Sequence, residues 1–153
     1  MHGDGSFDLE FDLHAAQIIK DNGSRGIGRQ HKTINGRRVY WDPEGPRKRQ
    51  LKQRARITGL NWRNQKGIQA PAFDHVRVVA WIAYPPRVKR ADPGNLSHTI
   101  KPLIDGLTLA GLWPDDDSDH LIGPDYRRDP TTGIQGLWRV RLHIIPLNEK
   151  EQQ

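Results

Sequence analysis

The sequence predicts a small α/β or α+β domain, in which a mixed β-sheet packs against two main helices. The length of 153 residues suits one domain with a hydrophobic core of its own, expected over residues 1–147. Three segments have the composition and apolar pattern of strands, and two others repeat apolar residues at helical spacing. These strands and helices are interleaved along the chain, which is typical of a mixed fold.

The chain is expected to open with a strand and a long loop. FDLEFDLH, residues 7–14, alternates imperfectly and predicts the first strand. Residues 21–46 are rich in Gly, Asn and Pro and predict a long basic loop, in which Asn35-Gly36 is the place where a short hairpin could form. At the other end, residues 148–153 are expected to be a disordered tail.

A basic helix is predicted over residues 47–65. Gly59 is expected to weaken or kink it, and its apolar stripe is thin, with the candidates Leu51, Ala55, Leu60 and Trp62. From Arg25 to Lys66, thirteen Lys or Arg stand against two acids. Because the cations of such a helix have almost no acids to pair with, binding of an external anion explains this excess of positive charge better than a solvated amphipathic helix does.

The second half is expected to hold two strands and an apolar helix. Residues 75–86 are rich in Val, Ile, Trp and Tyr and predict the strongest strand. A helix is predicted over residues 95–113, with Pro102 in its first turn and Gly111 at its end. The apolar face of this helix is expected to consist of Leu96, Ile100, Leu103, Leu107 and Ala110. Residues 137–147 alternate well and predict the last strand.

Composition excludes some classes of protein and favours others. The chain has no cysteine, which rules out a disulfide scaffold and a thiolate zinc site. No segment resembles a signal peptide or is apolar enough to cross a bilayer, so a soluble, cytoplasmic protein is expected. The net charge of +6 favours a polyanion such as nucleic acid as partner, against the plainer alternative of a protein that is merely basic.

The acids of the second half form a focus of negative charge, at Asp92, Asp105, Asp115, Asp116, Asp117 and Asp119. Adjacent carboxylates raise each other's proton affinity, so water, nearby cations or a bound metal ion must offset the repulsion. Asp carboxylates suit Mg²⁺ or Mn²⁺, and Lys101, on the same helix face as Asp105, could stabilise a phosphate. Taken singly, each residue is better explained as a turn residue or a surface ion pair; taken together, they favour a site.

Residues 90–116, RADPGNLSHTIKPLIDGLTLAGLWPDD, resemble the motif region of the RusA-like Holliday junction resolvases, especially phage-encoded members. In that family an Asp-rich turn ends in Asn-Leu and is followed by a lysine. A helix reading Asp-(Gly/Ala)-Leu with Ala-Gly comes next, and then a closing Asp-Asp. All these parts occur here in order, and HLIG at residues 120–123 extends the match.

The resemblance implies roles for particular residues. The implied catalytic residues are Asp92, Lys101 and Asp116, and the implied metal ligands are Asp92, Asp105, Asp115 and Asp116, with Asn95 in support. Some members have a second acid where this chain has Gly94, and Lys101 lies further along the chain than in those members. Either Asp105 or Asp115 supplies the missing ligand, or the site binds metal more weakly, or the chain binds junctions and cuts them poorly.

The resemblance also implies an activity: Mg²⁺-dependent cleavage of Holliday junctions and other branched DNA, in recombination and repair, with Mn²⁺ as a substitute. No nucleotide cofactor is expected. A homodimer is expected, because two nicks on opposed strands must be placed symmetrically. Shape and phosphate contacts would dominate binding. The expected DNA contacts are Arg47, Lys48, Arg49, Lys52, Arg54, Arg56, Arg87, Lys89 and Arg90.

Two alternatives to this activity remain open at the level of sequence. One is a non-catalytic branched-DNA-binding protein of the same fold, which has lost a ligand at Gly94. The other is a small structural or assembly protein whose acids form only a solvated turn. If the chain is phage-encoded, its expected location is the cytoplasm of the host.

Overall fold

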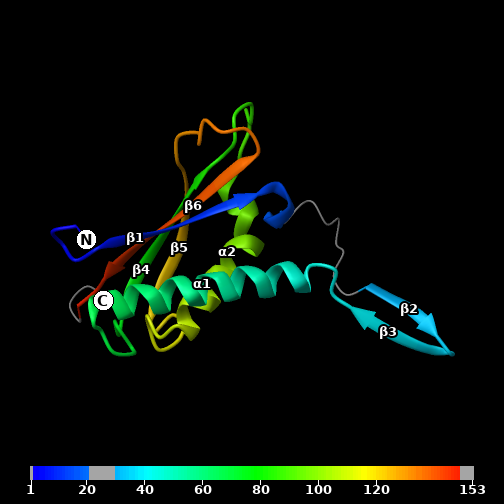
Figure 1. Ribbon diagram of the computed structural model, residues 1–153, viewed down its shortest axis with the longest axis horizontal. Coiled ribbons are helices and arrows are strands. Elements are labelled where there is room, and N and C mark those ends of the chain that lie inside the picture. Colours follow the sequence, from blue (N-terminus) through cyan, green and yellow to red (C-terminus); the bar gives the residue numbers. More distant parts are fainter. Residues whose placement is uncertain (1, 21–29, 149–153) are drawn as a thin grey trace.

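A computed structural model of the chain describes residues 2–20 and 30–148 (Figure 1). It is a mixed α+β fold with a four-stranded sheet, a separate two-stranded sheet and two helices, which confirms the predicted fold class. The strand order is β1-β6-β4-β5. β6 (Leu137–Pro146) lies antiparallel to both β1 (Phe7–His14) and β4 (Val76–Ala83), whereas β5 (Leu121–Arg128) runs parallel to β4.

The core lies between one face of this sheet and the two helices, α1 (Gly45–Lys66) and α2 (Ser97–Leu109). The alternation of β1 and β6 buries every second residue, because successive side chains of a strand point to opposite faces. The buried side chains include Phe11, Leu13, Ile82, Val140 and Leu142. Every residue predicted for the apolar face of the second helix is buried: Leu96, Ile100, Leu103, Leu107 and Ala110.

The two helices cross closely at two glycines. A Cβ atom at Gly59 would lie 2.7 Å from Ala110 Cβ, and one at Gly106 would run into the backbone of α1. α1 continues through Gly59 to Lys66, so this glycine serves the crossing of the helices. Glycine is the residue that permits such an approach, because it has no side chain to separate the two backbones.

The predicted long loop contains a hairpin. β2 (Gln30–Ile34) and β3 (Arg37–Trp41) pair around Asn35 and Gly36, whose φ angles of 52° and 77° suit a type I′ turn. Figure 1 shows this hairpin projecting beyond the N-terminal end of α1, away from the four-stranded sheet, and residues 31–40 are exposed. The rest of the predicted loop, 21–29, and residues 149–153 of the predicted tail lie outside the described residues.

In the second half one strand was not predicted, and the place predicted for Pro102 was wrong. The strand β5 had been assigned to no element. Gly123 and Pro124 are tolerated in it, because β5 is an edge strand and its register against β4 shifts between Arg77 and Val79. Pro102 was expected in the first turn of its helix. It lies inside α2, because the chain is already helical from Ser97 after a 3₁₀ turn at Pro93–Leu96.

Candidate functional site

The end of α2 is fixed by a cap that leads into the acidic turn, residues 115–119. Gly111 has a φ of 82°, and the N–H groups of residues 111 and 112 donate to carbonyls of the last helical turn, as in a Schellman cap. The carbonyls of the same two residues accept hydrogen bonds of 2.9 Å from Ala72 and Phe73. The turn is therefore anchored to the segment before β4 as well as to α2.

Lys101 joins α2 to the acidic turn. Its ammonium group lies 3.1 Å from Asp105 Oδ1 on the same helix face and also donates to Asp116 Oδ2. The hydrogen bond to Asp116 is the main cause that raises the pKa of Lys101 above its ordinary value. The same hydrogen bond lowers the pKa of Asp116, so a lysine of the chain offsets part of the repulsion in the acidic turn.

The remaining acids of the turn have local partners. Asp115 Oδ1 accepts a hydrogen bond of 2.7 Å from the Asp116 backbone N–H, and Asp117 Oδ1 accepts one of 3.1 Å from Asp119 N–H. These bonds are typical of Asp in tight turns, where the carboxylate replaces a backbone acceptor. The role of Asp117 is therefore explained by the structure of the turn.

Asp92 and Asn95 line a cavity of about 150 Å³. Asp92 Oδ1 accepts a hydrogen bond of 3.0 Å from Gly94 N–H and so caps the 3₁₀ turn. The same cavity is lined by Lys20, Tyr84, Val88, Arg90, Ala91, Leu96 and Trp138. The cavity thus combines two cations, one carboxylate and two aromatic rings.

Tyr84, which lines the same cavity, was not among the residues predicted for the site. Its side chain is buried, and its hydroxyl has no hydrogen-bond partner among the described residues. Burial raises the pKa of this hydroxyl, and the nearby Asp92 adds to the rise while Arg128 opposes it. Its position just before Pro85-Pro86 at the end of a predicted strand was the only signal in the sequence.

The predicted metal ligands lie in two separate places. Lys101 pairs with Asp105 and Asp116, and Asp115 precedes Asp116 in the turn. Asp92 lies instead at the cavity that Tyr84 lines. Over residues 2–20 and 30–148, one group of three potential ligands has its ligand atoms within 4.8 Å of one another, and it contains none of these four aspartates. The metal set stays a prediction, and its members need a rearrangement to share one ion.

A basic cavity of about 260 Å³ lies beside Lys101, between α1 and α2. Its lining residues are Lys48, Arg49, Lys52, His98, Lys101, Pro102 and Asp105. α1 carries eight Lys or Arg and no acid, and the close crossing at Gly106 brings its cationic face next to the Lys101 cluster. His98 was missed by the sequence reasoning, although its spacing of three from Lys101 places it on the same face of α2.

The predicted DNA-contacting residues lie on α1 and in the loop after β4. On α1, Arg47 pairs with Glu44 at 3.2 Å, and Arg54 donates to the Asp12 carbonyl at 2.5 Å, so both have structural partners. The side chains of Arg49, Lys52 and Arg56 on α1, and of Arg87, Lys89 and Arg90 in the loop, are exposed. Lys48 is half-buried and lies 3.5 Å from Asp42. The exposed cations are the ones available to an external anion.

The sequence was also compared with known proteins. A scan against models of protein families found no match, and no curated protein matched either. Within residues 2–20 and 30–148, no helix combines the length and the apolar character that crossing a membrane requires.

Proposed function

We propose that the chain is a magnesium-dependent endonuclease that cleaves Holliday junctions and other branched DNA by hydrolysis of phosphodiester bonds. The observation that carries the proposal is the cluster of Lys101, Asp105 and Asp116 beside a cavity lined by cations of α1. The motif of residues 90–116, which resembles the RusA-like resolvases, contains all three of these residues. Metal-dependent cleavage of a phosphodiester uses carboxylates to hold the ion, and a cationic surface beside them favours binding of the DNA backbone. Both features occur together at this cavity.

The residues of the cluster suit a magnesium ion. Mg²⁺ is held in proteins by one or two carboxylates together with water and phosphate oxygens, and Asp105 and Asp116 provide two carboxylates on adjoining elements. When bound, the ion supplies positive charge that favours attack of water on the phosphate. Asp115, which precedes Asp116 in the turn, is a further candidate ligand, and Asp92 would join only if the turn at Pro93–Leu96 moves.

Lys101 is assigned the role of a phosphate-stabilising group. Lys101 lies between Asp105 and Asp116, and its ammonium group offsets part of the negative charge of these two carboxylates. When a metal ion offsets the negative charge instead, the ammonium group is released to contact a phosphate oxygen at the edge of the same cavity. A side chain exposed to 61% can make this movement without disturbing the core.

DNA binding is assigned to the cationic face of α1. Arg49 and Lys52 line the cavity beside Lys101, and their charge is not neutralised by any acid of the same helix. A phosphate backbone that lies along this face would bring a phosphodiester to the carboxylates. Two copies of the chain, related by a twofold axis, would place two such sites on opposed strands of a four-way junction.

A non-catalytic branched-DNA-binding protein is the second candidate function. It is favoured by the position of Asp92 at a separate cavity and by Gly94, which stands where some relatives of the motif have an acid. In that case the cationic face of α1 would bind junctions, and the Lys101 cluster would be a structural ion-pair network.

The test is cleavage of a synthetic four-way junction with and without Mg²⁺. Asp116→Asn is expected to abolish nicking and to leave junction binding in place, whereas the neighbouring Asp117→Asn, which keeps an acceptor for Asp119 N–H, should cut like the wild type. Equal cutting by wild type, Asp116→Asn and Asp92→Asn would refute the site. Binding without any strand breaks in Mg²⁺ or Mn²⁺, with cutting restored by Gly94→Asp, would instead establish the second candidate.

A further inference from the structure

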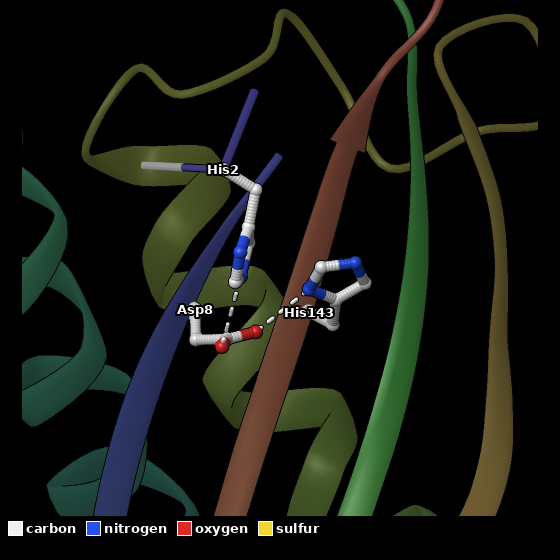
Figure 2. A group of neighbouring side chains, drawn as sticks. All are labelled: His2, Asp8 and His143. Carbon is white, nitrogen blue, oxygen red and sulfur yellow. Dashed lines mark hydrogen bonds and ion pairs between the residues drawn. The ribbon is translucent and has the colours of Figure 1, made fainter. Parts of the chain in front are cut away.

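Two histidines and an aspartate meet on the face of the sheet opposite the helices. His143 Nδ1 lies 2.7 Å from Asp8 Oδ1, and His2 Nε2 lies 3.6 Å from Asp8 Oδ2. One potential ligand atom from each of the three residues lies within 4.8 Å of the others. Figure 2 shows the imidazole rings of His2 and His143 both directed toward the Asp8 carboxylate, in front of the sheet, with the helices behind it.

The sheet register fixes two of these residues. Asp8 on β1 and His143 on β6 are directly opposite each other in an antiparallel pair, so their side chains point to the same face. Their neighbours Phe7, Leu9 and Ile144 are buried on the helix side. The alternation that builds the core therefore also sets an imidazole beside a carboxylate on the outer face.

A small turn places the third residue. His2 N–H donates to the Ser6 carbonyl at 2.8 Å, and Gly5 N–H donates to the His2 carbonyl at 3.0 Å. Asp4 Oδ1 accepts from both the backbone and the hydroxyl of Ser6, and Gly5 has a φ of 82° that closes the turn. The backbone of His2 is thereby held over β1, and its ring lies edge-on to that of His143 with centroids 5.6 Å apart.

The electrostatics of the cluster favour a dication. Arg141 lies 3.5 Å from Asp8 Oδ1, and Asp129 holds its guanidinium group at 3.2 and 3.3 Å. With both imidazoles neutral, two carboxylates face one guanidinium, which leaves one net negative charge.

We propose that His2, Asp8 and His143 bind a zinc ion on this open face of the sheet. Two imidazole nitrogens and one carboxylate oxygen are a ligand set typical of Zn²⁺ and poorly suited to Mg²⁺, which takes oxygen ligands. Zinc ligands at about 2.0–2.2 Å from the metal stand roughly 3.4 Å apart in a tetrahedron. The observed spacings need only rotamer-sized adjustments to reach this value, and a water molecule completes the coordination.

The ion would tie the turn at residues 2–6 to the strands β1 and β6. Its expected effect is a gain in stability, because a ligand that binds only the folded state shifts unfolding by mass action. This site lies on the opposite face of the sheet from α2 and uses none of the residues of the nuclease cluster. The proposal therefore stands or falls independently of the proposed cleavage of DNA.

The test is titration of the full chain with ZnSO₄, followed by thermal unfolding and by the visible spectrum of the Co²⁺-substituted protein. Zinc should raise the Tm of the wild type, and Co²⁺ should give the intense visible bands of a four-coordinate site. Zinc binding should be weakened by at least ~10-fold in each of His143→Gln, His2→Gln and Asp8→Asn. The reason is that removing a residue that merely hydrogen-bonds to a metal ligand already weakens metal binding by about this factor.

The matched control is Asp12→Asn. Asp12 lies on the same strand and face as Asp8 and likewise pairs with an arginine, Arg139, at 2.7 Å. This variant should keep the zinc affinity of the wild type, and unfolding without metal corrects for any change in basal stability. The proposal is overturned if zinc leaves the Tm of the wild type unchanged, or if Asp8→Asn and His143→Gln bind zinc as tightly as Asp12→Asn.

Discussion

The close crossing of α1 and α2 at Gly106 can be tested by adding one methyl group. In Gly106→Ala the new Cβ would collide with the Lys52 carbonyl oxygen and would lie 2.8 Å from Ala55 Cβ and 2.9 Å from Arg56 N. Two of these three atoms belong to the backbone of α1 and cannot rotate away. The helices must therefore move apart, and with them the Lys101 cluster and the cations of α1.

Two opposing terms set the size of the effect. Alanine is a better helix former than glycine by about 1 kcal/mol, which alone would stabilise α2. Overpacking a core costs about 1–3 kcal/mol and more where the backbone must shift, as it must at this crossing. The expected net result is a loss of about 2 kcal/mol, which corresponds to a fall in Tm of roughly 4–8 °C for a chain of this size.

Urea and thermal unfolding of Gly106→Ala and wild type measure this loss. Gly45→Ala is the matched control, because a Cβ there meets mainly the end of the flexible Arg49 side chain, at 3.2 Å, and should leave the stability almost unchanged. The close crossing would be refuted if Gly106→Ala were as stable as the wild type, or if it were more stable because alanine is the better helix former. Such a result would also remove the reason for placing the cations of α1 beside Lys101.

Three further predictions concern charge and packing. Lys101 lowers the pKa of Asp116, so the pair stabilises the fold above the unfolded pKa of about 3.9, and this contribution is lost as the pH falls. Because Lys101 is exposed, the contribution is below ~1 kcal/mol. The urea midpoint of Asp116→Asn should therefore change less from pH 6 to about pH 3 than that of the wild type. Arg49→Ala and Lys52→Ala should each weaken junction binding and reduce the slope of log affinity against log salt by roughly 1; an unchanged slope would exclude phosphate contacts at these positions. Leu103→Ala should cost about 2–5 kcal/mol in urea unfolding, because Leu103 is fully buried, and a smaller loss would contradict its central place in the core.

Local rules account for the elements that the sequence predicted correctly. The strand at residues 7–14 has the predicted bounds, and the last strand, the basic helix and the apolar helix lie within a few residues of theirs. The last strand and the apolar helix carry strong periodic patterns, which reflect the burial of one face of each element. The first strand alternates imperfectly and the basic helix has only a thin apolar stripe, but in both the buried residues recur on one face. Gly111 ended α2 as expected, since a left-handed residue is needed there and glycine adopts it without strain.

The edge strand β5 could not be predicted in this way. Its residues alternate poorly, and Gly123-Pro124 is normally a signal for a turn. It became a strand because β4 presents a free edge, to which it adds in parallel, and a Cβ at Gly123 would lie only 2.5 Å from the Val78 carbonyl. A strand that depends on its partner in this way leaves no strong periodic pattern of its own.

The sequence by itself determined the chemistry that this protein has available: a cationic helix, a run of aspartates, and a lysine four residues before Asp105 on one helix face. Only the tertiary structure decided which of these groups meet. It brought Asp116 to Lys101, left Asp92 at another cavity, and assembled His2, Asp8 and His143 from both ends of the chain. Helical and strand periodicity act over a few residues, whereas the register of a sheet and the crossing of two helices set contacts between distant segments.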